Sequence, residues 1–195
     1  MKLPLTLITL VSFTLTCSIL AMNADEQALI NTAQLNPEAQ IKLLLDKGTS
    51  VNCADVNGST PLHHACGSAS ISIVNLLIAH KADVNCQDIS KVTPLHIAAR
   101  HGINEMVETL LNNGAHVNAE TKVKKTPLVW AAMGNQLDTV KLLLKRGADA
   151  TWQAENGKRF CDYASDTATG FLMQELYKQY AFPGYGSDYI DELLK

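Results

Sequence analysis

The stretch TPLHHA at residues 60–65 decides the fold, because it returns twice along the chain. It recurs as TPLHIA at residues 93–98 and as TPLVWA at residues 126–131, so both steps are 33 residues long. A Val-Asn pair keeps the same spacing and begins at positions 51, 84 and 117. A constant period of this length indicates a repeat protein, in which small units stack and bury one continuous core.

Extending the period in both directions predicts five units within residues 23–182. They cover about residues 27–59, 60–92, 93–125, 126–158 and 159–182. The outer two copies are weaker, since Gln27–Ala33 and Arg159–Ala164 stand where the motif belongs. Such degeneracy is typical of terminal units, because one face of each meets water instead of a neighbour.

The residue types inside each unit favour two short helices. Thr60 can cap a first helix, and Pro61 can follow at its first position, where a missing N–H costs nothing. The apolar run at 73–78 has the spacing of a second, amphipathic helix. A glycine in constant phase, such as Gly114, fits the left-handed residue that ends a helix, and Lys81 takes that place once. We therefore expect an all-α solenoid of stacked helix–turn–helix units joined by hairpin-like fingers.

This pattern resembles the ankyrin-repeat family, whose 33-residue unit carries the TPLHxA signature. The resemblance extends over roughly 155 of the 195 residues and is specific for the fold. It implies an array that binds a protein partner and performs no catalysis. It also implies that His63 and His96 are structural residues, each tying its own loop to the neighbouring finger through hydrogen bonds.

The resemblance further implies that a partner touches the finger tips and the ends of the first helices, on the concave side. Carried over by repeat phase, the expected partner-binding residues are Val56, Asn57, Ser59, Ile89, Ser90, Arg100, His101, Lys122, Val123, Lys125, Trp130 and Met133. The same phases also include Ser68, Val92, Gly134, Glu155, Asn156 and Lys158.

Two questions stay open at this surface. Trp130 is either a packing residue or a binding anchor, since aromatic side chains are common at interface hot spots. Five basic residues at neighbouring finger phases are either solvated tips or a basic stripe that favours an acidic partner. They are Lys91, Lys124, Lys125, Lys158 and Arg159.

The first 22 residues are typical of a targeting segment. Lys2 precedes an uncharged, mostly apolar run from Leu3 to Met22. A secretory signal peptide has this pattern. A signal anchor that stays in the bilayer is the alternative, because about 20 apolar residues can span a membrane. We expect export to the periplasm or the cell exterior, with a mature N-terminus between about Ser18 and Asp25.

Charge and motif content argue against several classes of function. Without residues 1–22 the chain has 15 Lys and Arg against 19 Asp and Glu, and this net charge of −4 disfavours nucleic-acid binding. No GxSxG, phosphate-cradling, HExxH or CxxC motif is present. His63 and His64 are adjacent, so on a helix they point about 100° apart and do not chelate one metal ion. Because stacked repeats lack the deep pocket that holds small ligands, we expect no enzyme activity, cofactor, metal or small-molecule substrate.

Cys53 and Cys86 look like a disulfide pair in an exported protein, because they occupy the same phase of adjacent units. Equivalent positions in stacked units lie about 8–10 Å apart, whereas a disulfide needs Cα atoms within about 7 Å. We therefore expect no bond between them. Cys66 and Cys161 fall at core phases, so the sequence predicts four free thiols after residue 22.

Together these features predict a non-enzymatic protein-interaction scaffold of an exported ankyrin-repeat protein. A membrane-tethered adaptor held by residues 3–22 and a secreted, host-directed effector are the alternatives. The tail, residues 183–195, leaves the repeat at Pro183–Gly186 and is compatible with a short helix over Asp188–Leu194. It either covers the last unit or serves as a short partner-binding peptide.

Overall fold

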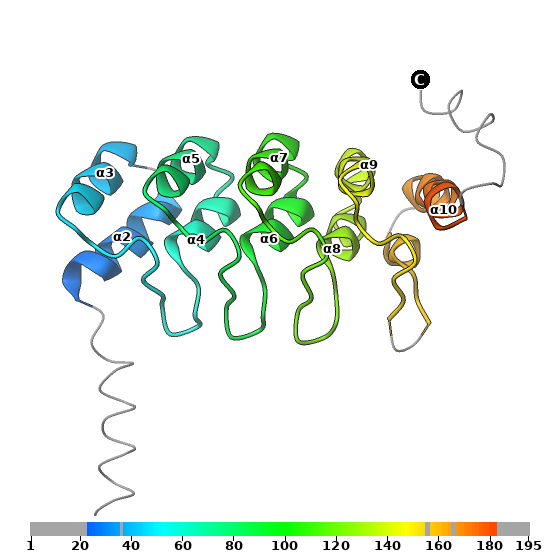
Figure 1. The fold of residues 1–195 in the computed structure, drawn as a ribbon, viewed down its shortest axis with the longest axis horizontal. Helices are drawn as coiled ribbons and strands as arrows, with labels where there is room; N and C mark the ends of the chain where they lie inside the picture. Colours follow the sequence, from blue (N-terminus) through cyan, green and yellow to red (C-terminus); the bar gives the residue numbers. More distant parts are fainter. Residues whose placement is uncertain (1–22, 36, 155–156, 165–166, 183–195) are drawn as a thin grey trace, which may run out of the picture.

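The computed structural model describes residues 23–35, 37–154, 157–164 and 167–182. Its helices come in pairs that stand side by side in one row (Figure 1). The first members of the pairs are α2 (Ala24–Leu35), α4 (Pro61–Gly67), α6 (Pro94–His101), α8 (Pro127–Met133) and the 3-10 helix η1 (Phe160–Tyr163). The second members are α3 (Glu38–Asp46), α5 (Ile71–Ala79), α7 (Asn104–Asn112), α9 (Leu137–Lys145) and α10 (Thr167–Ala181). The all-α solenoid predicted from the sequence is confirmed.

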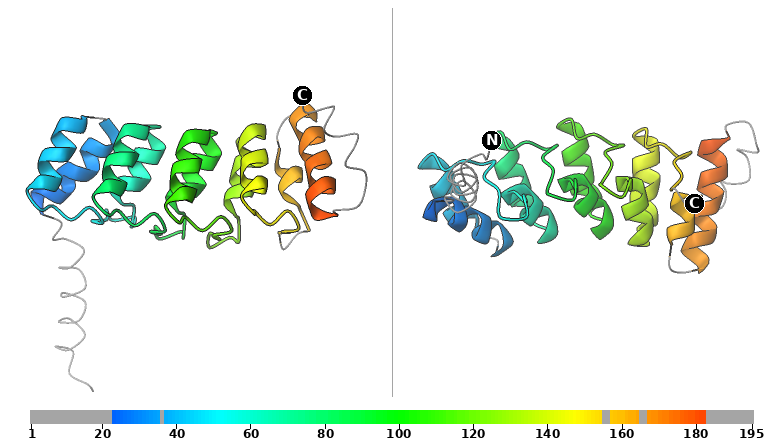
Figure 2. Two further views of the ribbon diagram at one scale, coloured as in Figure 1. Left: turned by 45° about the horizontal axis from the view of Figure 1, so that its top comes forward. Right: turned by 90° about the horizontal axis from the view of Figure 1, so that it is seen from below.

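The first and second helices form two layers, and the fingers project from one side of the row (Figures 1 and 2). Each first helix packs on the next one along the chain, and each second helix packs on the first helix of its own unit. We call the loops at residues 52–59, 85–92, 118–125 and 151–158 the first to fourth fingers. The surface between the finger tips and the first helices is the one on which the sequence places partner contacts.

The TPLH motif joins each inner unit to the next. The backbone N–H of Thr93 donates to Nδ1 of His96 at 3.2 Å, so Nε2 of His96 carries the proton. That Nε2 donates to the carbonyl of Lys125, in the following finger, at 3.1 Å. His63 makes the equivalent bonds, including one of 3.0 Å to the carbonyl of Val92. The structural role expected for both histidines is confirmed.

The fingers are also bonded to one another near their tips. The N–H of Ile89 donates to the carbonyl of Asn57 at 2.9 Å. One unit later, the N–H of Lys122 donates to the carbonyl of Ser90 at 2.9 Å. These bonds hold the first three fingers at the spacing of the stacked units.

The recurring Val-Asn pair bridges consecutive units in a way that the sequence pattern did not reveal. The amide oxygen of Asn85 accepts the N–H of His116 at 2.8 Å, and its Nδ2 donates to the carbonyl of Gly114 at 2.9 Å. Asn52 and Asn118 accept the corresponding N–H groups of the units that follow them. The residues that repeat every 33 positions therefore include some that bond one unit to the next, as well as those that form the helices within each unit.

A left-handed residue follows each of the second helices α3, α5, α7 and α9. The φ angles are +89°, +87° and +88° at Gly48, Gly114 and Gly147. Lys81 stands in the same phase with φ +69°, as its substitution for glycine predicted.

Small side chains let the first helices approach closely in the core. Ala98, Ala99, Ala131 and Ala132 are fully buried, and Cys66 fills the corresponding place in α4. The larger core residues come from both layers and include Leu62, Leu95, Leu128, Ile73, Leu77, Met106, Leu110 and Leu143. Cys161 is buried too, so the core positions predicted for these two cysteines are confirmed.

The four cysteines that the structure describes are free thiols. Sγ of Cys53 lies 3.8 Å from the carbonyl oxygen of Glu26, and Sγ of Cys86 lies 3.2 Å from Oγ1 of Thr60. Cys53 thus contacts α2 and Cys86 contacts the N-cap residue of α4, in each case at the first helix of its own unit. Two side chains that repeat by translation along the stack point in the same direction and not toward each other.

The end units depart from the inner pattern. Helix α2 has 12 residues and begins at Ala24, three residues before the start predicted from the repeat phase. In the last unit Arg159 and Phe160 replace Thr-Pro, and the first helix shrinks to the four residues of η1. Helix α10 lengthens to 15 residues and packs on η1 and α9.

Three predictions fall outside the described residues: the targeting segment at 1–22, the short helix in the tail at 183–195, and the expected contacts Glu155 and Asn156. Within the part of the chain that the structure describes, no helix is both long and apolar enough to cross a bilayer.

Candidate functional site

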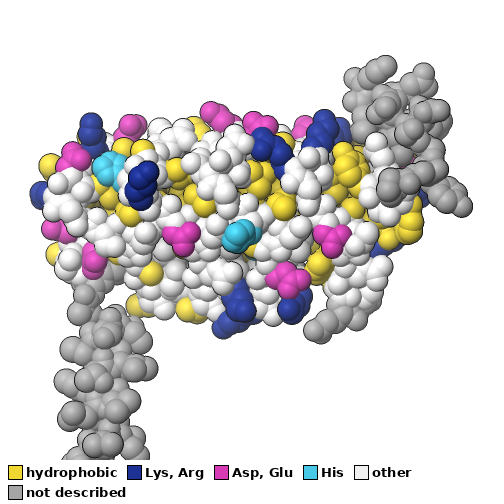
Figure 3. All heavy atoms as spheres, viewed as in Figure 1, with side chains coloured by type: hydrophobic (Ala, Val, Ile, Leu, Met, Phe, Trp, Pro, Cys, Tyr) yellow, Lys and Arg dark blue, Asp and Glu magenta, His cyan; other side chains and the backbone are white. Residues whose placement is uncertain are grey.

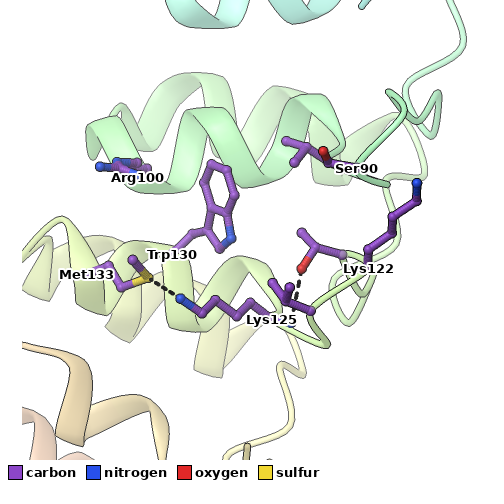
Figure 4. Close-up of a pocket in the computed structure, with 9 residues that line it drawn as sticks. Ser90, Arg100, Lys122, Lys125, Trp130 and Met133 are labelled. Carbon is purple, nitrogen blue, oxygen red and sulfur yellow. Dashed lines mark hydrogen bonds between the residues drawn. The ribbon is translucent and has the colours of Figure 1, made fainter. Parts of the chain in front are cut away.

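A pocket of about 540 Å³ opens between the second and third fingers and the first helices α6 and α8 (Figure 4). Two elements of the finger row and two helix ends contribute its walls. The lining residues are Ser90, Val92, Arg100, Thr121, Lys122, Val123, Lys125, Trp130 and Met133. The pocket is an open hollow of the array surface, and the indole of Trp130 forms part of its lining.

Seven of the twelve predicted partner-binding residues line this one pocket. They are Ser90, Arg100, Lys122, Val123, Lys125, Trp130 and Met133. The other five lie elsewhere on the same side: Val56, Asn57 and Ser59 on the first finger, Ile89 on the second finger, and His101 at the end of α6. The predicted site, which is spread along the array, therefore includes a hollow formed by seven of its twelve residues.

Trp130 is a packing residue and a pocket wall at once. Its ring lies edge-to-face against His96, with the ring centres 5.4 Å apart, and the Cζ atom of Arg100 lies 5.7 Å from the ring centre. Figure 4 shows the indole rising from α8 between Arg100 and the second finger. Its Nε1 is buried and has no hydrogen-bond partner among the described residues. The packing role is shown, and the role as a binding anchor stays a prediction.

The pocket carries positive charge. Arg100, Lys122 and Lys125 stand on its rim, and no carboxylate is found among its lining residues. The first two fingers have an aspartate, Asp55 and Asp88, that accepts N–H groups of its own finger. The third finger closes instead through a threonine.

Thr121 is the residue that sequence reasoning missed. It shares the phase of Asp55 and Asp88, and its Oγ1 accepts the N–H of Lys125 at 3.1 Å. A neutral hydroxyl thus replaces a carboxylate in the third finger, one of the two fingers that line the pocket. The sequence does show a change from Asp to Thr at this phase. The repeat period does not reveal that the change removes a negative charge beside the pocket.

The five basic residues do not form one continuous stripe. Lys124 pairs with Glu120 at 3.0 Å, and Arg159 pairs with Asp162 at 3.1 Å. The Nζ atoms of Lys125 and Lys158 lie 5.1 and 5.7 Å from the centre of the Tyr163 ring. Figure 3 shows lysine and arginine side chains at the ends of the middle fingers.

Lys91 and Lys124 occupy an unusual backbone position. Their φ angles are +58° and +60°, whereas glycines, Gly58 and Gly157, fill the same phase in the first and fourth fingers. A left-handed lysine costs roughly 1 kcal/mol relative to glycine. Both fingers that border the pocket have this less stable backbone position, and each thereby presents a charged lysine side chain there.

The histidines of the first helices have no arrangement that suggests catalysis. Burial lowers the pKa of His96 to about 4 and also lowers the pKa of His63, so both rings are neutral near pH 7. Nε2 of His64 lies 3.0 Å from Oδ2 of Asp55, which is in the first finger. Across the described residues no three His, Cys, Asp or Glu side chains cluster in a way that could hold a metal ion.

Comparison with known proteins agrees with the stacked architecture. A family model described as ankyrin repeats (3 copies) matches residues 9–88 and 69–154. The chain belongs to the ankyrin-repeat family. Ankyrin repeats imply a protein-binding scaffold.

A similar ankyrin sequence occurs in the 2-5A-dependent ribonuclease of Mus musculus. It is 40% identical to this ankyrin-repeat chain over 57 residues, which are 29% of this chain and 8% of that protein. The match lies in the repeat part. The nuclease activity in its name belongs to a protein of which this chain covers a small fraction.

Proposed function

We propose that this ankyrin-repeat chain is a non-enzymatic scaffold that binds a partner protein on its finger and first-helix surface, with the Trp130 pocket as the anchor point. The observation that carries the proposal is the convergence of seven predicted contact residues on one hollow. These positions follow from the family resemblance and the repeat phase, neither of which predicts a pocket. Their meeting in space supports a site and not a scatter of exposed side chains.

The composition of the pocket fits a protein interface. Interface cores are enriched in aromatic residues, Met and Arg, and hot spots favour Trp, Tyr and Arg in particular. Here Trp130, Met133 and Arg100 stand together, and Val123 exposes 70% of its surface beside them. The bonds between fingers hold this set in place before a partner arrives, which reduces the entropy that binding must overcome.

A pull-down from the native compartment tests the proposal. The bait is the exported chain, crosslinked in place and compared with Trp130→Ala, Val123→Arg and the triple variant Lys122→Glu, Lys124→Glu, Lys125→Glu. Each variant is expected to lose most of the captured partner while its circular dichroism spectrum stays helical. Lys42→Glu with Lys47→Glu, two exposed positions in the first unit, is the matched charge control. Equal capture by all variants would move the site away from the pocket.

We also propose that residues 1–22 direct export and are then removed. The apolar run after Lys2 supports this, and the tethered adaptor differs only in keeping the segment. Intact-mass measurement of the native protein is the test. A mature N-terminus between about Ser18 and Asp25 is expected, membrane-bound protein that retains Met1 supports the tethered form, and soluble cytoplasmic protein that retains Met1 contradicts both.

A further inference from the structure

The Trp130 pocket carries positive charge on two opposite sides of the indole. Arg100 lies in the last turn of α6, at the end of that helix away from the fingers, whereas Lys122 and Lys125 belong to the third finger. Figure 4 shows Arg100 on one side of Trp130 and Lys122 on the other. Among the described residues none of these three cations pairs with a carboxylate.

The two adjacent lysines of the third finger differ in this respect. Lys124 pairs with Glu120 at 3.0 Å, so its charge is already matched. Nζ of Lys125 lies 3.5 Å from Sδ of Met133 and 5.1 Å from the ring centre of Tyr163, and neither contact neutralises it. The charge of Lys125 is therefore available to a molecule in the pocket, and that of Lys124 is not.

The two fingers bring little negative charge to the pocket. Asp88 of the second finger uses its carboxylate within that finger, where it accepts the N–H groups of Ser90 and Val92 at 2.7 and 2.8 Å. The third finger has the neutral Thr121 in the same phase. Lysine and arginine side chains donate hydrogen bonds and accept none. An occupant must therefore supply both the acceptors and the negative charge.

The rest of the lining is apolar. Val92, Val123, Trp130 and Met133 contribute to it, and Val123 is 70% exposed. An isolated anion would leave this apolar surface uncovered. A side chain that is apolar itself, with carboxylates near it, matches both parts of the pocket.

We propose that the Trp130 pocket binds an acidic segment of a partner protein in which an apolar side chain is flanked by carboxylates. The apolar side chain enters beside the indole. Carboxylates on one side of it pair with Arg100, and those on the other side pair with Lys122 and Lys125. This inference rests on the proposed scaffold function and adds the chemistry of the partner segment.

Synthetic peptides test the proposal on the full chain by fluorescence anisotropy. The probe is fluorescein-labelled Gly-Asp-Glu-Phe-Asp-Glu-Gly. One control replaces every acid with its amide, and a second replaces Phe with Ala. The probe is expected to bind at least about tenfold more tightly than either control, because several ion pairs or one buried aromatic ring supply about that much. Equal affinity of the probe and either control overturns the proposal.

Two further peptides test whether both sides of the pocket take part. One has glycine in place of the two acids before Phe, and the other has glycine in place of the two acids after it. Each is expected to bind about threefold more weakly than the probe, since an exposed ion pair contributes less than about 1 kcal/mol. If either peptide binds as tightly as the probe, the two-sided arrangement is wrong.

Neutral substitutions locate the charges on the chain. Arg100→Gln and Lys122→Gln change exposed side chains, and each is expected to weaken the probe about threefold. The matched control is the double variant Glu120→Gln, Lys124→Gln, which removes a paired cation of the same finger without changing the net charge. It is expected to bind as the parent does. Parent-like affinity in both single variants contradicts the proposal.

Thr121→Asp tests the missing carboxylate directly. It gives the third finger the residue that the first two fingers have, so the finger keeps an acceptor for its own N–H groups. The added negative charge is expected to weaken the probe about threefold. Thr121→Asn supplies a neutral acceptor of the same shape and is expected to bind as the parent does. Equal affinity of the two variants counts against the electrostatic argument.

A synthetic copy of residues 183–195 is the last probe, because this segment also contains acidic and apolar residues. If it binds the pocket more tightly than the designed peptide, the occupant is the chain's own tail and the assignment to a partner is overturned. Failure here is distinguishable from failure of the scaffold function. Should capture of the native partner still depend on Trp130 while every acidic peptide fails, only the chemistry of the partner segment is wrong.

Discussion

Val129 stands where the two preceding units have His63 and His96, and this single change leaves a buried hydroxyl without a partner. Oγ1 of Thr93 lies 2.9 Å from Nδ1 of His96, whereas Oγ1 of Thr126 is buried and unbonded among the described residues. The same capping threonine is therefore hydrogen-bonded in the third unit, at Thr93, and unbonded in the fourth unit, at Thr126.

The two threonines should respond differently to the same substitution. Thr93→Val removes a buried hydrogen bond and is expected to lower the free energy of unfolding by about 1 kcal/mol or more. Thr126→Val removes an unsatisfied hydroxyl and is expected to leave stability unchanged or raise it by up to about 1 kcal/mol. Urea denaturation followed by circular dichroism measures both. A loss of equal size in the two variants would show that the Thr126 hydroxyl is bonded in solution.

His96 makes the stability of the array depend on pH. Its pKa is lowered to about 4, first because burial disfavours the charged ring. A group whose folded pKa lies below its unfolded pKa of about 6.5 stabilises the fold above that pH and loses this contribution as pH falls toward 4. The loss from this residue is expected to be about 3 kcal/mol between pH 7 and pH 4.

Denaturation midpoints measured at several pH values check this. His96→Asn removes the titrating ring and is expected to lower stability at pH 7 but to flatten its fall between pH 6.5 and 4. The His63 contribution remains in that variant, because burial lowers its pKa too. A slope as steep as that of the parent chain in this window would contradict the assignment to His96.

At the scale of helices and loops, most of the architecture was predictable because each element has a local cause. Thr-Pro starts the first helices, and a left-handed residue follows each inner second helix, including Lys81 where glycine is absent. The repeat period extended this to the whole row. The His63 and His96 bonds followed from the family resemblance.

The end units could not be predicted as well. Their sequences lack Thr-Pro. No short segment therefore predicted the length of α2, or that the first helix of the last unit would shorten to η1. An end unit is shaped by the loss of one neighbour, which is a property of the stack and not of any short segment. The bridges made by the Val-Asn pairs were missed for a similar reason, since they join residues about 30 positions apart.

The register of the stack predicts the state of the cysteines. Cys53 and Cys86 each contact the start of the first helix of their own unit, and burial raises the pKa of both thiols to about 11. A buried thiol that stays protonated exchanges slowly with disulfides. Thiol counting on denatured, unreduced protein that starts after residue 22 is expected to give four. A count of two, with a linked Cys53–Cys86 peptide found by mass spectrometry, would require a different packing of adjacent units.

At the scale of the whole molecule, the candidate site was only partly predictable. The family resemblance and the repeat phase together selected the side of the array and seven of the pocket residues. They did not show that these residues line one pocket, because that pocket forms only where side chains of two fingers and two helices, from different units, meet in space.

The central claim is that a partner protein binds at this pocket, and site-specific photo-crosslinking in the native compartment tests it most directly. Benzoylphenylalanine is placed at Val123, 70% exposed beside the pocket, and at Leu43, 56% exposed on α3 in the other helix layer. Both positions tolerate a large apolar side chain because both are open to solvent. The account predicts a discrete crosslinked partner from Val123 and none from Leu43. A partner captured from Leu43 alone, or equally from both positions, would contradict it.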